Sequence, residues 1–179
     1  MPNAWVVRQR DGFLALSGAT IARADATEWT FFEDDILFDH PALPFLQLAT
    51  LDLTLADGRA VRVLTYQNDT TFGLSIGHAL PHPDVGPLGA AYRERALEGL
   101  AGQTVAEVEV HLDEGEDVGE VRLRLASGAT VILVAGEVEE TPDPDTVVVR
   151  RRDESVLLFW SEADLAAVPF DSPLALRSA

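Results

Sequence analysis

Two stretches of this chain, seventy positions apart, show nearly the same alternation of apolar and polar residues around a glycine. Residues 51–66 read LDLTLADGRAVRVLTY, and residues 121–136 read VRLRLASGATVILVAG. Alternation with a period of two is typical of half-buried β-strands, and a glycine between two such runs predicts a hairpin. The stretches therefore predict two similar antiparallel hairpins. Either an internal duplication or convergence of two solvent-faced hairpins explains the similarity.

The register of each hairpin follows from the need to keep its apolar side chains on one face. A three-residue turn over residues 56–58, with Gly58 in the left-handed region, satisfies this need. It also places Asp52 opposite Arg62 on the other face, where unlike charges stabilise the pair. The same turn with Gly128 serves the second hairpin. The predicted apolar pairs are Leu51 with Val63, Leu53 with Val61, Val121 with Leu133, and Leu123 with Val131.

The rest of the chain predicts more short strands and little helix. A medium helix is expected over residues 86–102 because Gly86 and Pro87 suit its start and Gly102 its end. A short helix is expected after Ser161, which begins a capping-box pattern. The fold class is therefore α+β leaning mainly β, with antiparallel sheets of about nine to eleven short strands. Further strands are predicted over residues 4–9, 13–22, 28–38 (as a pair), 71–77, 104–112, 146–150 and 155–160.

The Pro- and Gly-rich segment over residues 78–87 is the best candidate boundary between two halves. Residues 1–85 would form an N-terminal β-rich half, and residues 86–179 a helix followed by a C-terminal β-rich half. One continuous domain is the alternative. In the second half, residues 131–134 are apolar at four consecutive positions, which predicts a strand covered on both faces.

The charge of the chain restricts its partners. The formal net charge is −17, and all 13 basic residues are Arg. Phosphate contacts need a basic face, so we predict no nucleic-acid partner. The acidity indicates either a surface that meets a basic protein or a surface that is merely soluble or adapted to salt.

Composition also restricts location and chemistry. No run approaches the ~20 apolar residues that cross a bilayer, and the first residues lack the pattern of a secretory signal. We therefore expect a cytoplasmic protein with no membrane partner. The chain has no Cys, which excludes disulfides, thiolate nucleophiles and Cys-ligated metals.

Few patterns in the chain point to catalysis or cofactors. There is no nucleophile elbow, no phosphate-binding loop and no dinucleotide fingerprint. His78 and His82 are spaced as a helical metal pair would be, but Pro81 and Pro83 oppose a helix there. We interpret the two histidines as part of a surface loop and predict no metal and no cofactor. The acidic loop over residues 113–120 departs from the calcium-loop pattern and is interpreted as a solvated turn.

Some side chains suggest burial or contact with a partner. Glu28 lies beside Trp29 in a predicted strand, where it either points to water, which we favour, or is a buried carboxylate. Adjacent Phe159 and Trp160 point to opposite faces of a strand, so we expect both faces to be covered. A second subunit is one way to cover them, which predicts a homodimer.

These observations favour a non-enzymatic, acidic module that binds another protein. The alternatives are a small-molecule-binding protein or hydrolase with a pocket between the two halves, and a structural or assembly domain. For the pocket alternative, the candidate ligand-binding residues are His40, Tyr66, His78, His82 and Arg93.

Overall fold

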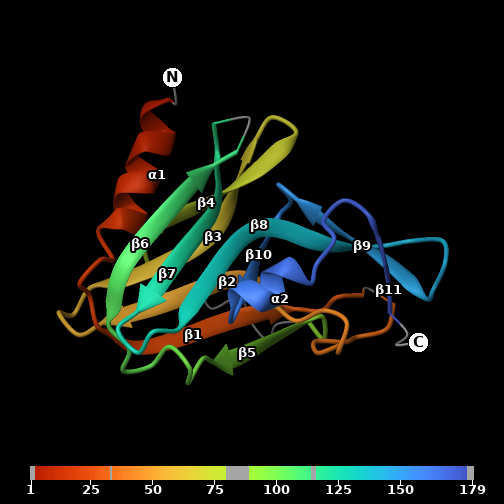
Figure 1. Cartoon of the computed structure of the whole chain (residues 1–179), viewed down its shortest axis with the longest axis horizontal. Coiled ribbons are helices and arrows are strands. Elements are labelled where there is room, and N and C mark those ends of the chain that lie inside the picture. Colours follow the sequence, from red (N-terminus) through yellow and green to blue (C-terminus); the bar gives the residue numbers. More distant parts are fainter. Residues whose placement is uncertain (1–2, 33, 80–88, 114–115, 177–179) are drawn as a thin grey trace.

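The structure, a computed structural model, describes residues 3–32, 34–79, 89–113 and 116–176. Within them, eleven antiparallel strands form one open sheet accompanied by two helices, which confirms the mainly β expectation (Figure 1). The helices are α1 (Ala4–Leu14) and α2 (Glu162–Ala166). The strands are β1 (Ile21–Trp29), β2 (Leu46–Leu55), β3 (Ala60–Asn68), β4 (Thr71–His78), β5 (Tyr92–Ala96), β6 (Val105–Leu112), β7 (Val118–Leu125), β8 (Thr130–Glu140), β9 (Thr146–Arg151), β10 (Ser155–Phe159) and β11 (Pro173–Ala175). Neither described helix is long and apolar enough to span a membrane.

Strands from both ends of the chain share the sheet. Its central path runs β11-β9-β8-β10-β2-β1-β5, with β3 and β4 branching from β2, and β7 and β6 branching from β8. The late strand β10 pairs with the early strand β2, and β5 pairs with β1. The segments on either side of the predicted boundary therefore interleave, although their status as two units stays a prediction.

Both predicted hairpins form in the predicted register. Leu51 faces Val63 in the first hairpin, and Val121 faces Leu133 in the second. The turn glycines adopt left-handed backbone angles, with φ of +88° at Gly58 and +92° at Gly128. On the polar face of the first hairpin, Arg62 Nε donates to Asp52 at 2.6 Å. This hydrogen bond raises the pKa of Arg62 above its ordinary value.

Two apolar clusters divide the core between the faces of the sheet. The inner cluster joins both hairpins, with Leu53 and Leu123 fully buried in it. The outer cluster lies on the opposite face of β8 and β10. Val131 and Leu133 belong to the inner cluster and Ile132 and Val134 to the outer one, so the expectation that residues 131–134 are covered on both faces is confirmed.

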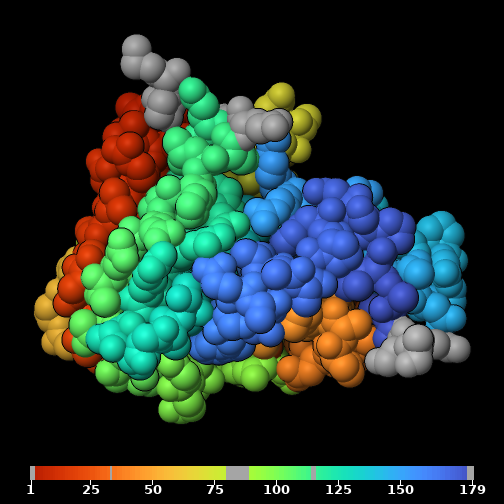
Figure 2. Space-filling model, in the orientation of Figure 1, coloured from red at the N-terminus to blue at the C-terminus, as the bar shows by residue number. Residues whose placement is uncertain are grey.

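The segment after β1 and the C-terminal segment cover the outer cluster. Phe31 and Phe45 from the first segment, and Val168 from the second, are buried against β8 and β10. Figure 2 shows these segments, orange and blue respectively, side by side on one face of the molecule. The sheet is thus covered locally by chain that lies outside the two hairpins.

Corresponding hydrogen bonds join the two hairpins to the starts of β1 and β6. Ala56 N donates to Thr20 O, and Ala126 N donates to Thr104 O, both at 2.8 Å. Thr20 and Thr104 form an antiparallel bridge, and their hydroxyl oxygens lie 2.9 Å apart. Each hairpin tip is therefore attached in the same way to a threonine, Thr20 before β1 or Thr104 before β6.

The residues on either side of these threonines form a reciprocal pair of backbone hydrogen bonds. Gly18 N donates to Val105 O, and Gly102 N donates to Ile21 O, both at 2.7 Å. Gly18 and Gly102 also share left-handed backbone angles, with φ of +80° and +77°. This arrangement is what a local twofold axis through the threonine pair would produce.

The strand predicted over residues 4–9 is wrong, and the strand predicted over residues 13–22 is wrong in its first part, because residues 4–14 form α1. The Asn3 side chain caps the helix by accepting from Val6 N at 3.0 Å. Val6, Gln9 and Phe13 are its buried residues, at spacings that match one helical face. Helical spacing and a cap therefore outweigh the strand preference of the Val6–Val7 pair.

The strand pair predicted over residues 28–38 is also wrong. β1 ends at Trp29, and irregular chain follows. The Thr30 hydroxyl accepts from Leu37 N at 2.8 Å and donates to Phe32 O at 3.0 Å. Because one side chain satisfies several backbone groups, this segment keeps its shape without a strand ladder.

The helix predicted over residues 86–102 is wrong in its described part. Residues 92–96 form β5, a short edge strand that pairs with β1, and residues 98–102 form turns. The expected helix start at Gly86 and Pro87 lies outside the described residues. By contrast, the short helix after Ser161 is confirmed, with Ser161 Oγ accepting from Asp164 N at 3.1 Å.

Candidate functional site

The structure does not gather the predicted ligand-binding residues into one described pocket. His40 lies in the irregular segment before β2, Tyr66 in β3, exposed His78 at the end of β4, and Arg93 in β5. Among them, only His40 lines any of the three pockets described below. His82 lies outside the described residues. Within the described chain, no group of three or more His, Asp or Glu side chains is arranged to hold a metal ion.

Arg93 takes part in a charged cluster around a buried carboxylate. Glu28 is 1 % exposed and accepts hydrogen bonds from Arg93 and Arg95, so the interpretation that it points to water is wrong. Asp39 accepts from Arg93 at 2.9 Å on the exposed side of the cluster. The hydrogen bond from Arg93 is the main cause that lowers the pKa of Asp39. The two arginines and the two carboxylates carry equal and opposite charges. The ion pairs with Glu28 join β1 to β5, which indicates a structural role.

Tyr66 belongs to a second polar cluster, which surrounds the buried carboxylate of Asp117. Its hydroxyl donates to Asp117 at 2.7 Å, and Asn68 Nδ2 donates to the same carboxylate at 2.9 Å. Asp117 is 1 % exposed, so this part of the predicted solvated loop is in fact buried. Burial and the hydrogen bond to Asp117 raise the pKa of Tyr66 far above its ordinary value, and the phenol stays protonated. The cluster joins the β3–β4 hairpin to the turn before β7.

A pocket of about 360 Å³ opens where β1 ends beside the last part of β8. We call it the Trp29 pocket. Five of its nine lining residues are acidic, and none of the nine carries a positive charge. They are Trp29, Thr30, Phe31, Asp34, Glu137, Val138, Glu139, Glu140 and Asp153.

A second pocket, of about 390 Å³, adjoins the first and shares Asp34 and Glu140 with it. It is lined by further carboxylates and by apolar side chains. Its lining residues are Phe32, Asp34, Asp35, Leu37, His40, Glu140, Thr141, Asp143, Pro144, Asp145, Thr146, Val147 and Leu176. We call the two pockets together the acidic groove. Eight carboxylates and several apolar side chains line it, and no Arg occurs among its described lining residues.

Buried bonds hold the two sides of the Trp29 pocket together. Gln47 of β2, 2 % exposed, donates to Thr30 O at 3.0 Å and accepts from Val138 N at 2.8 Å. Gly136 lies in β8 at the point where the pairing of β8 with β10 ends and its pairing with β9 begins. A Cβ atom at Gly136 would collide with Arg150 O, so glycine lets the strands approach closely just before Glu137.

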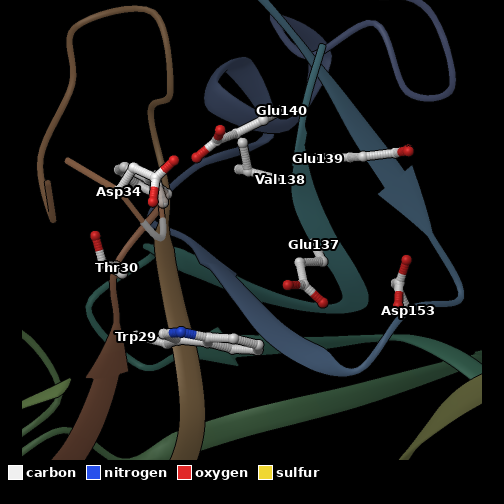
Figure 3. Close-up of a pocket in the computed structure, with 9 residues that line it drawn as sticks. Trp29, Thr30, Asp34, Glu137, Val138, Glu139, Glu140 and Asp153 are labelled. Carbon is white, nitrogen blue, oxygen red and sulfur yellow. The ribbon is translucent and has the colours of Figure 1, made fainter. Parts of the chain in front are cut away.

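Figure 3 shows how the labelled side chains lie around the Trp29 pocket. The indole of Trp29 is seen edge-on along one side, and the carboxylate of Glu137 lies on the pocket side of the ring. Asp34 and Glu140 turn their carboxylates toward one another. Glu139 points away from them, toward β9, where it accepts from Arg150 at 2.6 Å. The pocket thus offers a flat aromatic surface beside several negative charges.

A third pocket, of about 450 Å³, lies beside Trp160 and includes His40 and Arg95. It mixes charges of both signs with Pro and Leu side chains. Trp160 is 37 % exposed, and its ring packs over Gly99, whereas neighbouring Phe159 is fully buried. The expectation that both aromatics are covered therefore holds for Phe159 and only in part for Trp160.

The acidic groove can hold cations, because carboxylates around a concave wall concentrate negative potential there. The three threonine hydroxyls of its described lining, those of Thr30, Thr141 and Thr146, donate hydrogen bonds to backbone carbonyls. The chain matches no family model, no curated protein sequence and no solved structure.

Apart from His40, the residues that line this groove were not predicted as site residues from the sequence. Glu137, Glu139 and Glu140 follow directly after the apolar run of β8, and an acidic stretch also includes Asp34. Their acidity was visible, but their proximity was not, because more than a hundred positions separate Asp34 from Glu140. The available signal was a carboxylate-rich end on a strand whose preceding residues are mostly apolar.

Proposed function

We propose that this chain is a non-enzymatic binding module that holds a basic partner protein in its acidic groove. The observation that carries the proposal is the coincidence of a concave surface, eight carboxylates and apolar walls. Scattered surface charge gives solubility, whereas a concave acidic wall with apolar patches also provides an area that a partner can fill.

The net charge of the chain supports the same partner chemistry. At −17, the molecule attracts basic proteins over a distance of about 10 Å at moderate salt and repels acidic ones. Binding energy then comes from the half-buried side chains of Leu37 and Leu176 in the groove wall, which a partner would remove from water. Cytoplasmic location and a homodimer stay predictions, and the mass of the protein in solution tests the latter.

The test uses a synthetic peptide of alternating Lys and Gly as the probe, with calorimetry at low and at physiological salt. The groove variant combines Asp34→Asn, Glu137→Gln and Glu140→Gln. The matched control combines Asp11→Asn, Glu98→Gln and Glu107→Gln, which removes the same charge at exposed positions outside the groove.

We expect the groove variant to bind the peptide at least about tenfold more weakly than the parent, equivalent to about 1.4 kcal/mol. The control should lose less than about threefold, because distant exposed charges are screened. Equal losses in the two variants would mean that net charge alone attracts the peptide. Either that result or a parent that binds no peptide would overturn the proposal.

The alternative of a small-molecule site between the two halves receives less support. The inner cluster fills the space between the hairpins with side chains such as Leu53, Val63, Leu123 and Leu133, all at most 1 % exposed. A pocket there would need these side chains to separate.

A further inference from the structure

The described chain twice holds an arginine between an aromatic face and a carboxylate. The guanidinium carbon of Arg93 lies 4.4 Å from the ring centroid of Phe38, and Arg93 also binds Glu28. The guanidinium carbon of Arg151 lies 4.2 Å from the ring centroid of Phe170. Its Nη1 atom is 3.3 Å from Glu120. In both places the planar cation is stacked on a ring and bonded at its edge.

The Trp29 pocket also brings together an aromatic face and carboxylates. Trp29 supplies a larger aromatic face than Phe, and Glu137 places its carboxylate on the pocket side of that ring (Figure 3). None of the described lining residues is a cation. The pocket volume of about 360 Å³ leaves room for a side chain from outside.

Trp29 is held in position before any partner arrives. Its ring stacks on Tyr92, with centroids 5.9 Å apart and an interplanar angle of 18°. Tyr92 does not line the pocket, so this stack supports one face of the indole and leaves the other to the pocket. The backbone next to it is fixed by Thr30 N, which donates to Ala91 O at 2.9 Å. A rigid aromatic surface loses little entropy when a ligand stacks on it.

We propose that the Trp29 pocket receives an arginine side chain of the basic partner, stacked on Trp29 and bonded to Glu137. This inference rests on the proposed function and names the residue that the partner inserts. A guanidinium is preferred to an ammonium because it is planar, is more weakly hydrated and presents several donors in one plane. Lysine can satisfy the carboxylates of the groove but gains less from the indole face.

The test compares two peptides of equal length, one of alternating Arg and Gly and the other of alternating Lys and Gly. Calorimetry gives their affinities for the parent and for Trp29→Leu, Glu137→Gln and the control Trp160→Leu. Spectra of ¹⁵N-labelled protein follow the three indole N–H signals, assigned with single Trp variants that include Trp5→Leu. These spectra also show whether each variant is folded.

We expect the parent to prefer the Arg peptide by about five- to tenfold, and Trp29→Leu to remove most of that preference. Glu137→Gln should weaken both peptides, and Trp160→Leu should change neither. The Arg peptide should shift the Trp29 indole signal and leave those of Trp5 and Trp160 in place. The indole signal of the parent tests the inference even where Trp29→Leu fails to fold.

The two proposals fail in different ways. If the Lys peptide binds in the groove and the Arg peptide binds no better, the proposed function stands and the arginine inference is overturned. An Arg preference that survives in folded Trp29→Leu, or an unmoved Trp29 signal in the parent, overturns the inference as well. If neither peptide binds the parent, both proposals are overturned.

Discussion

Gln47 accepts a hydrogen bond at its side-chain oxygen from the backbone N–H of Val138, at 2.8 Å. Its amide nitrogen donates to the Thr30 carbonyl at 3.0 Å, so one buried side chain joins the end of β1 to the end of β8. These two backbone positions are walls of the Trp29 pocket. The two sides of the pocket are therefore joined by a polar contact, although apolar packing surrounds that contact.

Replacing Gln47 with Leu tests that contact. The Gln47→Leu variant leaves the N–H of Val138 and the C=O of Thr30, both buried residues, without their side-chain partner. We expect a loss of about 2–4 kcal/mol in the free energy of unfolding, measured with urea. The control is Gln67→Leu, at an exposed position, which should change stability by less than about 0.5 kcal/mol. A Gln47→Leu variant as stable as this control would contradict the structural role.

The two turn glycines should be equally sensitive to substitution. Gly58→Val and Gly128→Val place a side chain on a left-handed backbone, and we expect each to cost about 1 kcal/mol or more. No atom lies within 4 Å of a Cβ built at either position, so the cost is conformational and not a clash. Gly77 has equally open surroundings but no positive φ, and Gly77→Val is therefore the control. Equal melting temperatures for the three variants would contradict the turn assignment.

The Tyr66 hydroxyl should stabilise the fold through Asp117. In Tyr66→Phe, this buried carboxylate loses one of its donors, and we expect a loss of about 1–3 kcal/mol. The chain has only two tyrosines, so Tyr92→Phe provides a matched removal of a phenol hydroxyl. Chemical denaturation of both variants makes the comparison, and equal stabilities would show that the hydroxyl bond to Asp117 contributes nothing.

Asp39 should stabilise the fold in a pH-dependent way. Its pKa is lowered in the folded state from 3.8, chiefly by the hydrogen bond from Arg93, so the unfolded chain binds the proton more tightly. Its contribution is therefore complete above the unfolded pKa and is lost as the pH falls through the folded one. We expect less than about 1 kcal/mol at neutral pH, because the side chain is 66 % exposed and screened.

The measurement compares urea unfolding of the parent and Asp39→Asn from neutral pH down to below 3.8. The stability difference should shrink as the pH falls, and also as salt is added at neutral pH. A difference that stays constant over this range would show that Asp39 acts by packing and not through its charge.

The hairpins were predictable because their information is local. An apolar residue at every second place and a glycine that tolerates positive φ determine strand, turn and register together, as the Leu53–Val61 pair shows. The capped helix after Ser161 was predictable for the same reason. The match between residues 16–21, LSGATI, and residues 100–105, LAGQTV, was also present in the sequence. It was missed, and it makes the internal duplication a stronger hypothesis.

The wrong predictions concern segments whose conformation depends on a distant partner. Residues 92–96 alternate in a way that suits either a helix or an edge strand. Glu28, more than sixty positions away, binds Arg93 and Arg95 only when they share one face of a strand. Likewise, α1 is stable because Phe13 is buried in the inner cluster, a contact that the strand-like Val6–Val7 pair could not reveal.

By itself, therefore, the amino-acid order determined the alternating strands, the glycine turns and the acidity of this protein, because each depends on neighbouring residues or on composition. Only the tertiary structure decided that the ends of β1 and β8 meet, that Trp29 and Glu137 line one pocket, and that eight carboxylates line one groove. Such proximity arises from long-range strand pairing and from the packing of the core, and no local pattern encodes it.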